Sequence, residues 1–227
     1  MCYSPDPVWL KTCNAIETSD MENTQGIKAV IFDLGRVIVD VDVGRLASFV
    51  SASPSQADVD RVIMDVLGDE LMHQFNTGKV GPEDFHRGIT RRFDLQLEFD
   101  EFATLWCGIF SPIAGMPELI RLLQGRFTLG LLSDTDPLHW NHLRSTYPIL
   151  SMFKRPTLSF QVGLTKPDRA IFLRAARDVQ TPPQQCLYID DLPANAAGAT
   201  AAGMQSIVFK DASDLRSRLI EKHLIED

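Results

Sequence analysis

The sequence of 227 residues has few cysteines, no long apolar run and a deficit of positive charge, and each shortage excludes a class of protein. The cysteines form no CxxC pair and have no histidine at metal-ligand spacing, so incidental or buried thiols are expected instead of a disulfide framework or zinc site. No apolar run approaches the ~18 residues of a membrane span. The net charge of −8 argues against nucleic acid, which selects basic faces. A cytoplasmic protein without membrane or nucleic-acid partners is expected. The cysteines are Cys2, Cys13, Cys107 and Cys186.

Residues 1–25 also lack a continuous apolar block, so we do not expect a secretory signal there. Pro5 and Pro7 stand among polar residues in this segment. The composition predicts a poorly ordered N-terminal extension.

The most informative stretch is the apolar run over residues 27–32, which ends at Asp33. Five of its six residues are apolar and several are β-branched, a pattern typical of a strand buried on both faces of a parallel sheet. Ligands of open α/β sheets bind beyond the carboxyl ends of the strands, so Asp33 stands where chemistry would occur. Taken alone, Asp33 could equally begin a turn.

The chain then divides into a helical block and a region of alternating strands and helices. Residues 43–112 show helical apolar spacing and no convincing strand between Val43 and Phe110. From Pro117 onward the alternation predicts βαβ units. The expected fold is α/β, a three-layer Rossmann-like parallel sheet carrying an inserted all-helical block. Further strands are expected over residues 127–132, 157–160, 186–189 and 206–209.

Three of these strands end in polar residues suited to one site, and a lysine precedes one of the helices. Because parallel strands bring their carboxyl ends to one sheet edge, these groups can converge. Several carboxylates need a compensating cation, and Mg²⁺ is the usual one beside a phosphate. Each residue alone could be a strand-end cap, a turn residue or a solvated lysine. The groups are Asp33, Ser133, Lys166 and the pair Asp190-Asp191.

In this order the segments resemble the four motifs of the haloacid dehalogenase-like (HAD) hydrolase superfamily. The segments are Phe32-Asp33-Leu34-Gly35, Leu132-Ser133-Asp134, Lys166-Pro167 and Ile189-Asp190-Asp191. The opening Asp-Leu-Gly-x-Val-x-Val-Asp and the pair Asp191 and Asn195 are similar to a subgroup of sugar-phosphate phosphatases related to bacterial α-glucose-1-phosphate phosphatase. The resemblance implies a core of residues 26–42 plus 113–227 and a helical C1 cap of residues 43–112.

The resemblance also implies an Mg²⁺-dependent phosphatase acting on a small phosphorylated metabolite. Asp33 would be the nucleophile, forming an aspartyl-phosphate. Mg²⁺ would be held by Asp33, the Gly35 carbonyl and Asp191, with Asp190 beside it. The phosphoryl group would be bound by Ser133, Asp134 and Lys166.

Gly35 departs from most phosphatases of the superfamily, which carry a second Asp there as general acid and base. A missing general acid costs roughly 10²–10⁴-fold in rate. A 2-haloacid dehalogenase and a non-catalytic phosphate-ester-binding protein therefore remain alternatives. Substitute acids could come from Asp40, Asp42, Asp134, Asp136 or His139. In the helical block, His73, Phe75 and Trp106 could line a pocket or belong to core or surface. The sequence marks no self-complementary face, so it predicts no oligomeric state.

Overall fold

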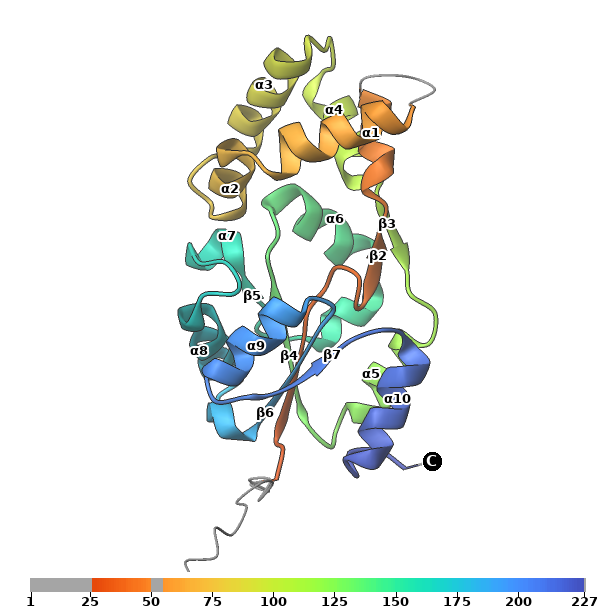
Figure 1. The fold of residues 1–227 in the computed structure, drawn as a ribbon, viewed down its shortest axis with the longest axis vertical. Coiled ribbons are helices and arrows are strands. Elements are labelled where there is room, and N and C mark those ends of the chain that lie inside the picture. Colours follow the sequence, from red (N-terminus) through yellow and green to blue (C-terminus); the bar gives the residue numbers. More distant parts are fainter. Residues whose placement is uncertain (1–25, 50–54, 227) are drawn as a thin grey trace, which may run out of the picture.

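The structure, a computed structural model, describes residues 26–49 and 55–226 (Figure 1). The expected N-terminal extension and its two cysteines lie outside these residues. Within the described part, no helix is long and apolar enough to cross a membrane.

The core is a parallel sheet of five strands in the order β5-β4-β1-β6-β7. Asp33 directly follows the central strand. The strand on one side of this central strand ends at Ser133, just before Asp134, and the strand on the other side ends just before Asp191. The sequence predicts a strand over 157–160, but β5 ends at Leu158 because Ser159 begins helix α7 and bonds with its hydroxyl to the backbone of Thr135. The strands are β1 (Ala29–Phe32), β4 (Thr128–Ser133), β5 (Thr157–Leu158), β6 (Cys186–Asp190) and β7 (Gln205–Val208).

Helices cover both faces of this sheet, which confirms the predicted three-layer α/β fold. On β1, Ala29 and Ile31 pack toward α8 and α9, whereas Val30 and Phe32 pack toward the opposite layer. This alternation explains why the whole strand is apolar. One layer contains α8 (Arg169–Asp178) and α9 (Pro193–Ala201), and the other contains α5 (Met116–Leu123), α6 (Pro137–Thr146) and α10 (Ala212–Glu221). The short α7 is Ser159–Val162, and the 3-10 turns η3 (Pro148–Met152) and η4 (Pro183–Gln185) complete the core.

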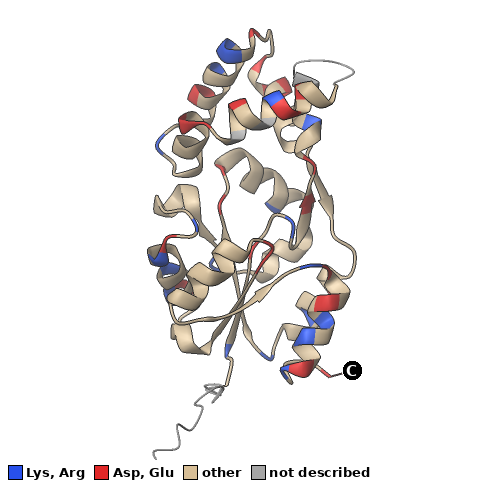
Figure 2. Cartoon of the chain, viewed as in Figure 1, with Lys and Arg blue, Asp and Glu red and all other residues tan. Residues whose placement is uncertain are grey.

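A separate group of helices lies above the sheet in Figure 1, and we call its residues 43–49 and 55–107 the cap. It has its own apolar cluster, in which Phe85 stacks on Phe75 and contacts Trp106 edge-on. Figure 2 shows charged residues along the outside of α3, α8 and α10. The cap contains η1 (Val43–Phe49), α1 (Gln56–Val62), the π-helical turn η2 (Ile63–Leu67), α2 (Glu70–Asn76), α3 (Pro82–Phe93) and α4 (Phe99–Cys107).

Two short antiparallel strands join the cap to the core. Strand β2 (Val39–Val41) pairs with β3 (Phe110–Pro112), and Asp40 lies opposite Ser111. The expectation of an entirely helical block over residues 43–112 is wrong for this last segment. Three residues are too few to show a strand period, and the partner strand is about 70 residues away, so the sequence pattern gave no signal.

Candidate active site

The parallel register brings three sheet-end residues together. Phe32 lies level with Leu131 on one side and with Ile189 on the other, and the Asp33 amide donates to the Ile189 carbonyl at 2.8 Å. Asp33 is 6% exposed, Ser133 3% and Asp190 0%. These polar groups are therefore buried at the carboxyl edge of the sheet.

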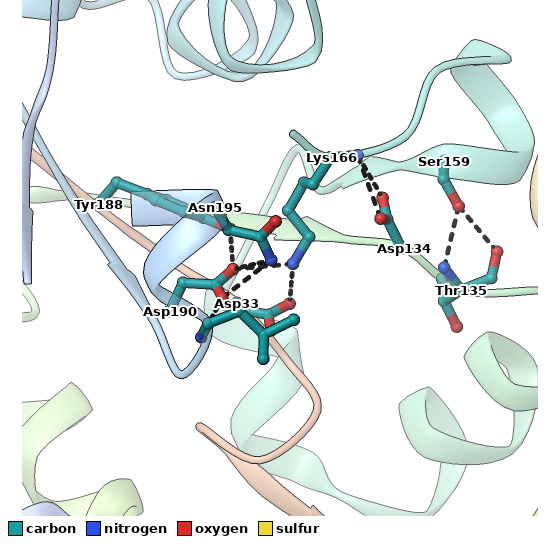
Figure 3. Close-up of polar contacts among 9 residues, drawn as sticks. Asp33, Asp134, Thr135, Ser159, Lys166, Tyr188, Asp190 and Asn195 are labelled. Carbon is teal, nitrogen blue, oxygen red and sulfur yellow. Dashed lines mark hydrogen bonds and ion pairs between the residues drawn. The ribbon is translucent and has the colours of Figure 1, made fainter. Parts of the chain in front are cut away.

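Lys166 joins two of these carboxylates (Figure 3). Its ammonium lies 2.8 Å from Asp33 and 2.9 Å from Asp190. Its backbone amide is held by both oxygens of Asp134, at 3.2 and 3.1 Å. Helix α8 begins only at Arg169, with Asp168 as its N-cap, so Lys166 belongs to the preceding loop and not to the helix. This placement removes the unfavourable interaction of a lysine with a helix N-terminus.

Asp190 is fixed by donors from three further residues. Its oxygens accept from the Leu192 amide at 2.9 Å and from the Asn195 side-chain amide at 3.0 and 3.1 Å. The Tyr188 hydroxyl, buried in the sheet, also donates to it. We did not predict Tyr188 from the sequence. The available signal was its position two residues before Asp190, because alternate residues of a strand share one face.

Burial and charge act against each other in this cluster. Burial raises the pKa of Asp33 to about 7, although Lys166 pulls it down. Burial also opposes ionisation of Asp190, but Lys166 and the Tyr188 hydroxyl outweigh it and lower the pKa of Asp190. Burial alone would lower the pKa of Lys166, yet the surrounding carboxylates raise it. Lys166 is therefore a permanent cation of the site.

The donor set fits a divalent cation. Oxygens of Asp33, Asp190 and Asp191 all lie within 4.8 Å of one another. Burial, then the charge of Asp190, raises the pKa of Asp191. The Lys166 ammonium pairs with two of these carboxylates, and the charges of Arg36 and Lys166 oppose that of the third, Asp191. Carboxylate oxygens of this kind are the ligands that Mg²⁺ prefers.

Two cavities adjoin the cluster. One, of about 160 Å³, lies between cap and core and is bordered by Gly35, Ser133 and Asp134 on the core side. The other, of about 470 Å³, is open and is bordered by Arg36, Asp191 and Lys210 among others. Arg36 is exposed and adopts the left-handed backbone conformation (φ 57°).

The five proposed substitute acids lie in different places, and one of them contacts the Lys166 loop. Asp40 and Asp42 are exposed, and Asp42 pairs with Arg45 at 3.2 Å. Asp136 and His139 are buried between α4 and α6 and bond to one another at 2.7 Å. Asp134 alone of these acids is bonded to the Lys166 loop.

The three candidate cap residues differ in position. Phe75 lies fully within the cap cluster. Trp106 is fully buried and also borders the smaller cavity. His73 is exposed on cap helix α2.

Comparison with known proteins agrees with this fold. The family profile described as haloacid dehalogenase-like hydrolase matches residues 27–203, and the chain belongs to this family. It is 25% identical to D-ribitol-5-phosphate phosphatase of Bacteroides thetaiotaomicron over 201 residues, which cover 85% of this chain and 97% of that protein. It is 24% identical to a sesquiterpene phosphatase of Aspergillus oryzae, over 82% and 91% of the two chains.

A solved structure shares the fold. A HAD family enzyme from Bacteroides thetaiotaomicron, in complex with magnesium and inorganic phosphate, superposes with a TM-score of 0.71. The identity is 22%, over 84% of this chain and 99% of that one. The chain thus belongs to a family of hydrolases, and phosphatases are among its relatives.

Proposed function

We propose that this chain is an Mg²⁺-dependent phosphatase that hydrolyses a small phosphorylated metabolite through an aspartyl-phosphate intermediate. The observation that carries the proposal is the cluster of Asp33, Asp190 and Asp191 around one buried lysine. Such an arrangement suits phosphoryl transfer, which depends mainly on positioning and on neutralising charge.

In the first step the Asp33 carboxylate attacks phosphorus, an Asp33–phosphorus bond forms and the bond to the ester oxygen breaks. The leaving oxygen takes a proton from a solvent water, since Gly35 offers no acid, and departs as an alcohol. In the second step water attacks phosphorus, and inorganic phosphate and the free Asp33 carboxylate are released. Ser133 donates a hydrogen bond to the phosphoryl group, and the Lys166 ammonium neutralises part of its charge. Asp134 holds the Lys166 loop in place through the backbone amide.

Asp33, Asp191 and the Gly35 carbonyl would hold the Mg²⁺ ion, with Asp190 beside it. When bound, this ion supplies positive charge that keeps the carboxylates ionised and offsets the charge of the phosphoryl oxygens. The magnesium and phosphate in the related Bacteroides structure support this assignment.

The cap would exclude water and select the leaving group. The sequence resemblance and the ribitol-phosphate relative favour a sugar or polyol phosphate, whereas the sesquiterpene relative acts on an apolar ester. The unpaired thiols of Cys107 and Cys186 support a cytoplasmic location.

The covalent intermediate provides the test. The protein is mixed with excess acetyl phosphate and Mg²⁺, quenched in acid, and its peptides are analysed by mass spectrometry. We expect a phosphoryl group on Asp33, and we expect Asp33→Asn to lose both this label and turnover. A label on another residue, or turnover retained by Asp33→Asn, would contradict the proposal.

A 2-haloacid dehalogenase is the second candidate, because enzymes of that class also use an Asp nucleophile and lack the second acid that Gly35 replaces here. That reaction needs no metal ion, whereas the convergence of the Asp33, Asp190 and Asp191 carboxylates favours one. Halide release from 2-chloropropionate without Mg²⁺ would favour the dehalogenase.

A further inference from the structure

The cavity between cap and core is apolar on its cap side and carries its polar residues on its core side. It adjoins the phosphoryl site through Gly35 and Ser133. Its polar residues all come from the core: Ser133, Asp134 and Thr135 from the segment at the end of β4, and His139 from helix α6. The cap contributes only Val43, Leu46, Met72 and Trp106, all of them apolar or aromatic. A leaving group that extends from the phosphoryl site toward the cap therefore meets an apolar wall.

The ring nitrogens of Trp106 and His139, which border the cavity beside this wall, are already bonded within the protein. The Trp106 indole N–H donates to Asp136 at 3.2 Å. Both ring nitrogens of His139 face acceptors, Asp136 at 2.7 Å and the Trp106 carbonyl at 2.9 Å. Sugar hydroxyls placed against the cap side would lose water without gaining equivalent partners, because Ser133, Asp134 and Thr135 line the core side, and each would weaken binding by roughly tenfold.

The size of the cavity limits the group that fits. Its volume is about 160 Å³. An apolar protein cavity of about 150 Å³ accepts benzene, a molecule of six carbon atoms. We propose that the natural leaving group is a compact apolar alcohol of about six carbon atoms, bound under Met72 and Trp106. This inference rests on the proposed phosphatase function and specifies its substrate class.

A series of alkyl phosphates tests the inference. With Mg²⁺ present, kcat/KM is measured for ethyl, butyl and hexyl phosphate, and for ribitol 5-phosphate and glucose 1-phosphate. The three alkyl leaving groups have similar chemistry, so differences among them report on burial. We expect kcat/KM to rise roughly fourfold for each added methylene up to hexyl. We expect both polyol esters to react no faster than ethyl phosphate.

Two methionine variants locate the effect. Met72→Gln introduces an amide of similar length into the cavity wall, and Met64→Gln makes the same change on a cap side chain that is 75% exposed and outside the cavity. We expect the hexyl-to-ethyl ratio of kcat/KM to fall several-fold in Met72→Gln and to stay unchanged in Met64→Gln. Equal ratios in the two variants would overturn the assignment of the cavity.

The possible failures can be told apart. Turnover that is independent of chain length, or faster with ribitol 5-phosphate, would overturn the apolar leaving group and leave the phosphatase intact. If neither acetyl phosphate nor any ester is hydrolysed, the proposed function is overturned. Calorimetry with butyl- and hexylphosphonate then tests the cavity alone. Tighter binding of the hexyl compound, with a more negative heat-capacity change, supports apolar binding, and equal binding overturns it.

Discussion

At the scale of single residues, Lys166 balances the charge of the site. Its ammonium lies within 2.9 Å of both Asp33 and Asp190, and its side chain is 5% exposed. Removing one partner from a buried ion pair is costly because the remaining charges stay buried and uncompensated. Lys166 therefore contributes to folding as well as to the proposed chemistry.

We expect Lys166→Met to lower the free energy of unfolding by about 3 kcal/mol at pH 8 without Mg²⁺. Urea denaturation measures this loss. Lys210→Met is the matched control, because Lys210 is exposed and makes only a 3.9 Å surface pair with Asp214. Equal stability of the two variants would show that Lys166 is not a structural cation.

Gly35 determines how strongly the rate should depend on the leaving group. With no acid at this position, alkyl esters should react much more slowly than p-nitrophenyl phosphate, whose leaving group needs no proton. A Cβ added here would lie 3.3 Å from the Val41 side chain, a tight contact that requires Val41 to shift slightly, and the backbone is not left-handed.

We therefore expect Gly35→Asp to raise the rate on butyl phosphate relative to p-nitrophenyl phosphate by about tenfold or more, toward the 10²–10⁴-fold effect of a general acid. Steady-state kinetics of both substrates measure the ratio, and Gly35→Ala controls for the added bulk. An unchanged ratio in Gly35→Asp would mean that another group already supplies the proton.

At the scale of secondary-structure elements, a buried polar link joins cap helix α4 to core helix α6. Asp136 caps α6 by accepting from the His139 amide at 2.9 Å and also accepts from the Trp106 indole. The His139 ring stacks on the Trp106 ring with centroids 5.0 Å apart. The two ring nitrogens of His139 lie 2.7 Å from Asp136 and 2.9 Å from the Trp106 carbonyl, so the ring contacts both sides of the link.

We expect His139→Leu to reduce the free energy of unfolding by about 2–3 kcal/mol, because Asp136 would keep its burial and lose a side-chain partner. His142→Leu, on the same helix but half-exposed, should change it by less than about 0.5 kcal/mol. Urea denaturation compares the two. A loss of similar size in both variants would contradict the link.

The elements were predictable where the sequence repeats a pattern over enough residues. The buried strand before Asp33 and the βαβ alternation after Pro117 identified the sheet and the convergence of strand ends. Strands β2 and β3 were not predictable, because each has three residues and their pairing spans the cap. The shortening of β5 depends on a tertiary bond from Ser159 to the β4 loop, which no local pattern encodes.

At the scale of the whole molecule, the net charge of −8 makes a bound cation a stabilising ligand. Any ligand that binds only the folded state raises stability by mass action. At about a hundredfold excess of Mg²⁺ over its dissociation constant, we expect the melting temperature to rise by roughly 5 °C. Differential scanning fluorimetry with and without EDTA measures the shift.

Asp191→Asn should lose most of this shift, whereas Asp60→Asn, an exposed change on α1, should keep it. The same shift in both variants would place the cation elsewhere on the acidic surface.

The site residues that the sequence predicted are those at strand ends and before a helix. Strand ends gave Asp33, Ser133 and Asp190–Asp191, and Lys166 was singled out by its place before a helix. The supporting Tyr188 hydroxyl and the apolar cap wall depend on how distant segments pack. The roles assigned to these residues stay predictions until they are measured.

The most direct test of the central claim is the hydrolysis of p-nitrophenyl phosphate, with and without Mg²⁺, by the wild type, Asp33→Asn and Asp60→Asn. This substrate needs no general acid, so Gly35 cannot mask activity. We predict Mg²⁺-dependent turnover by the wild type and Asp60→Asn, and a loss of about 10³-fold or more in Asp33→Asn. Absence of Mg²⁺-dependent turnover in the wild type, or turnover retained by Asp33→Asn, would contradict the account.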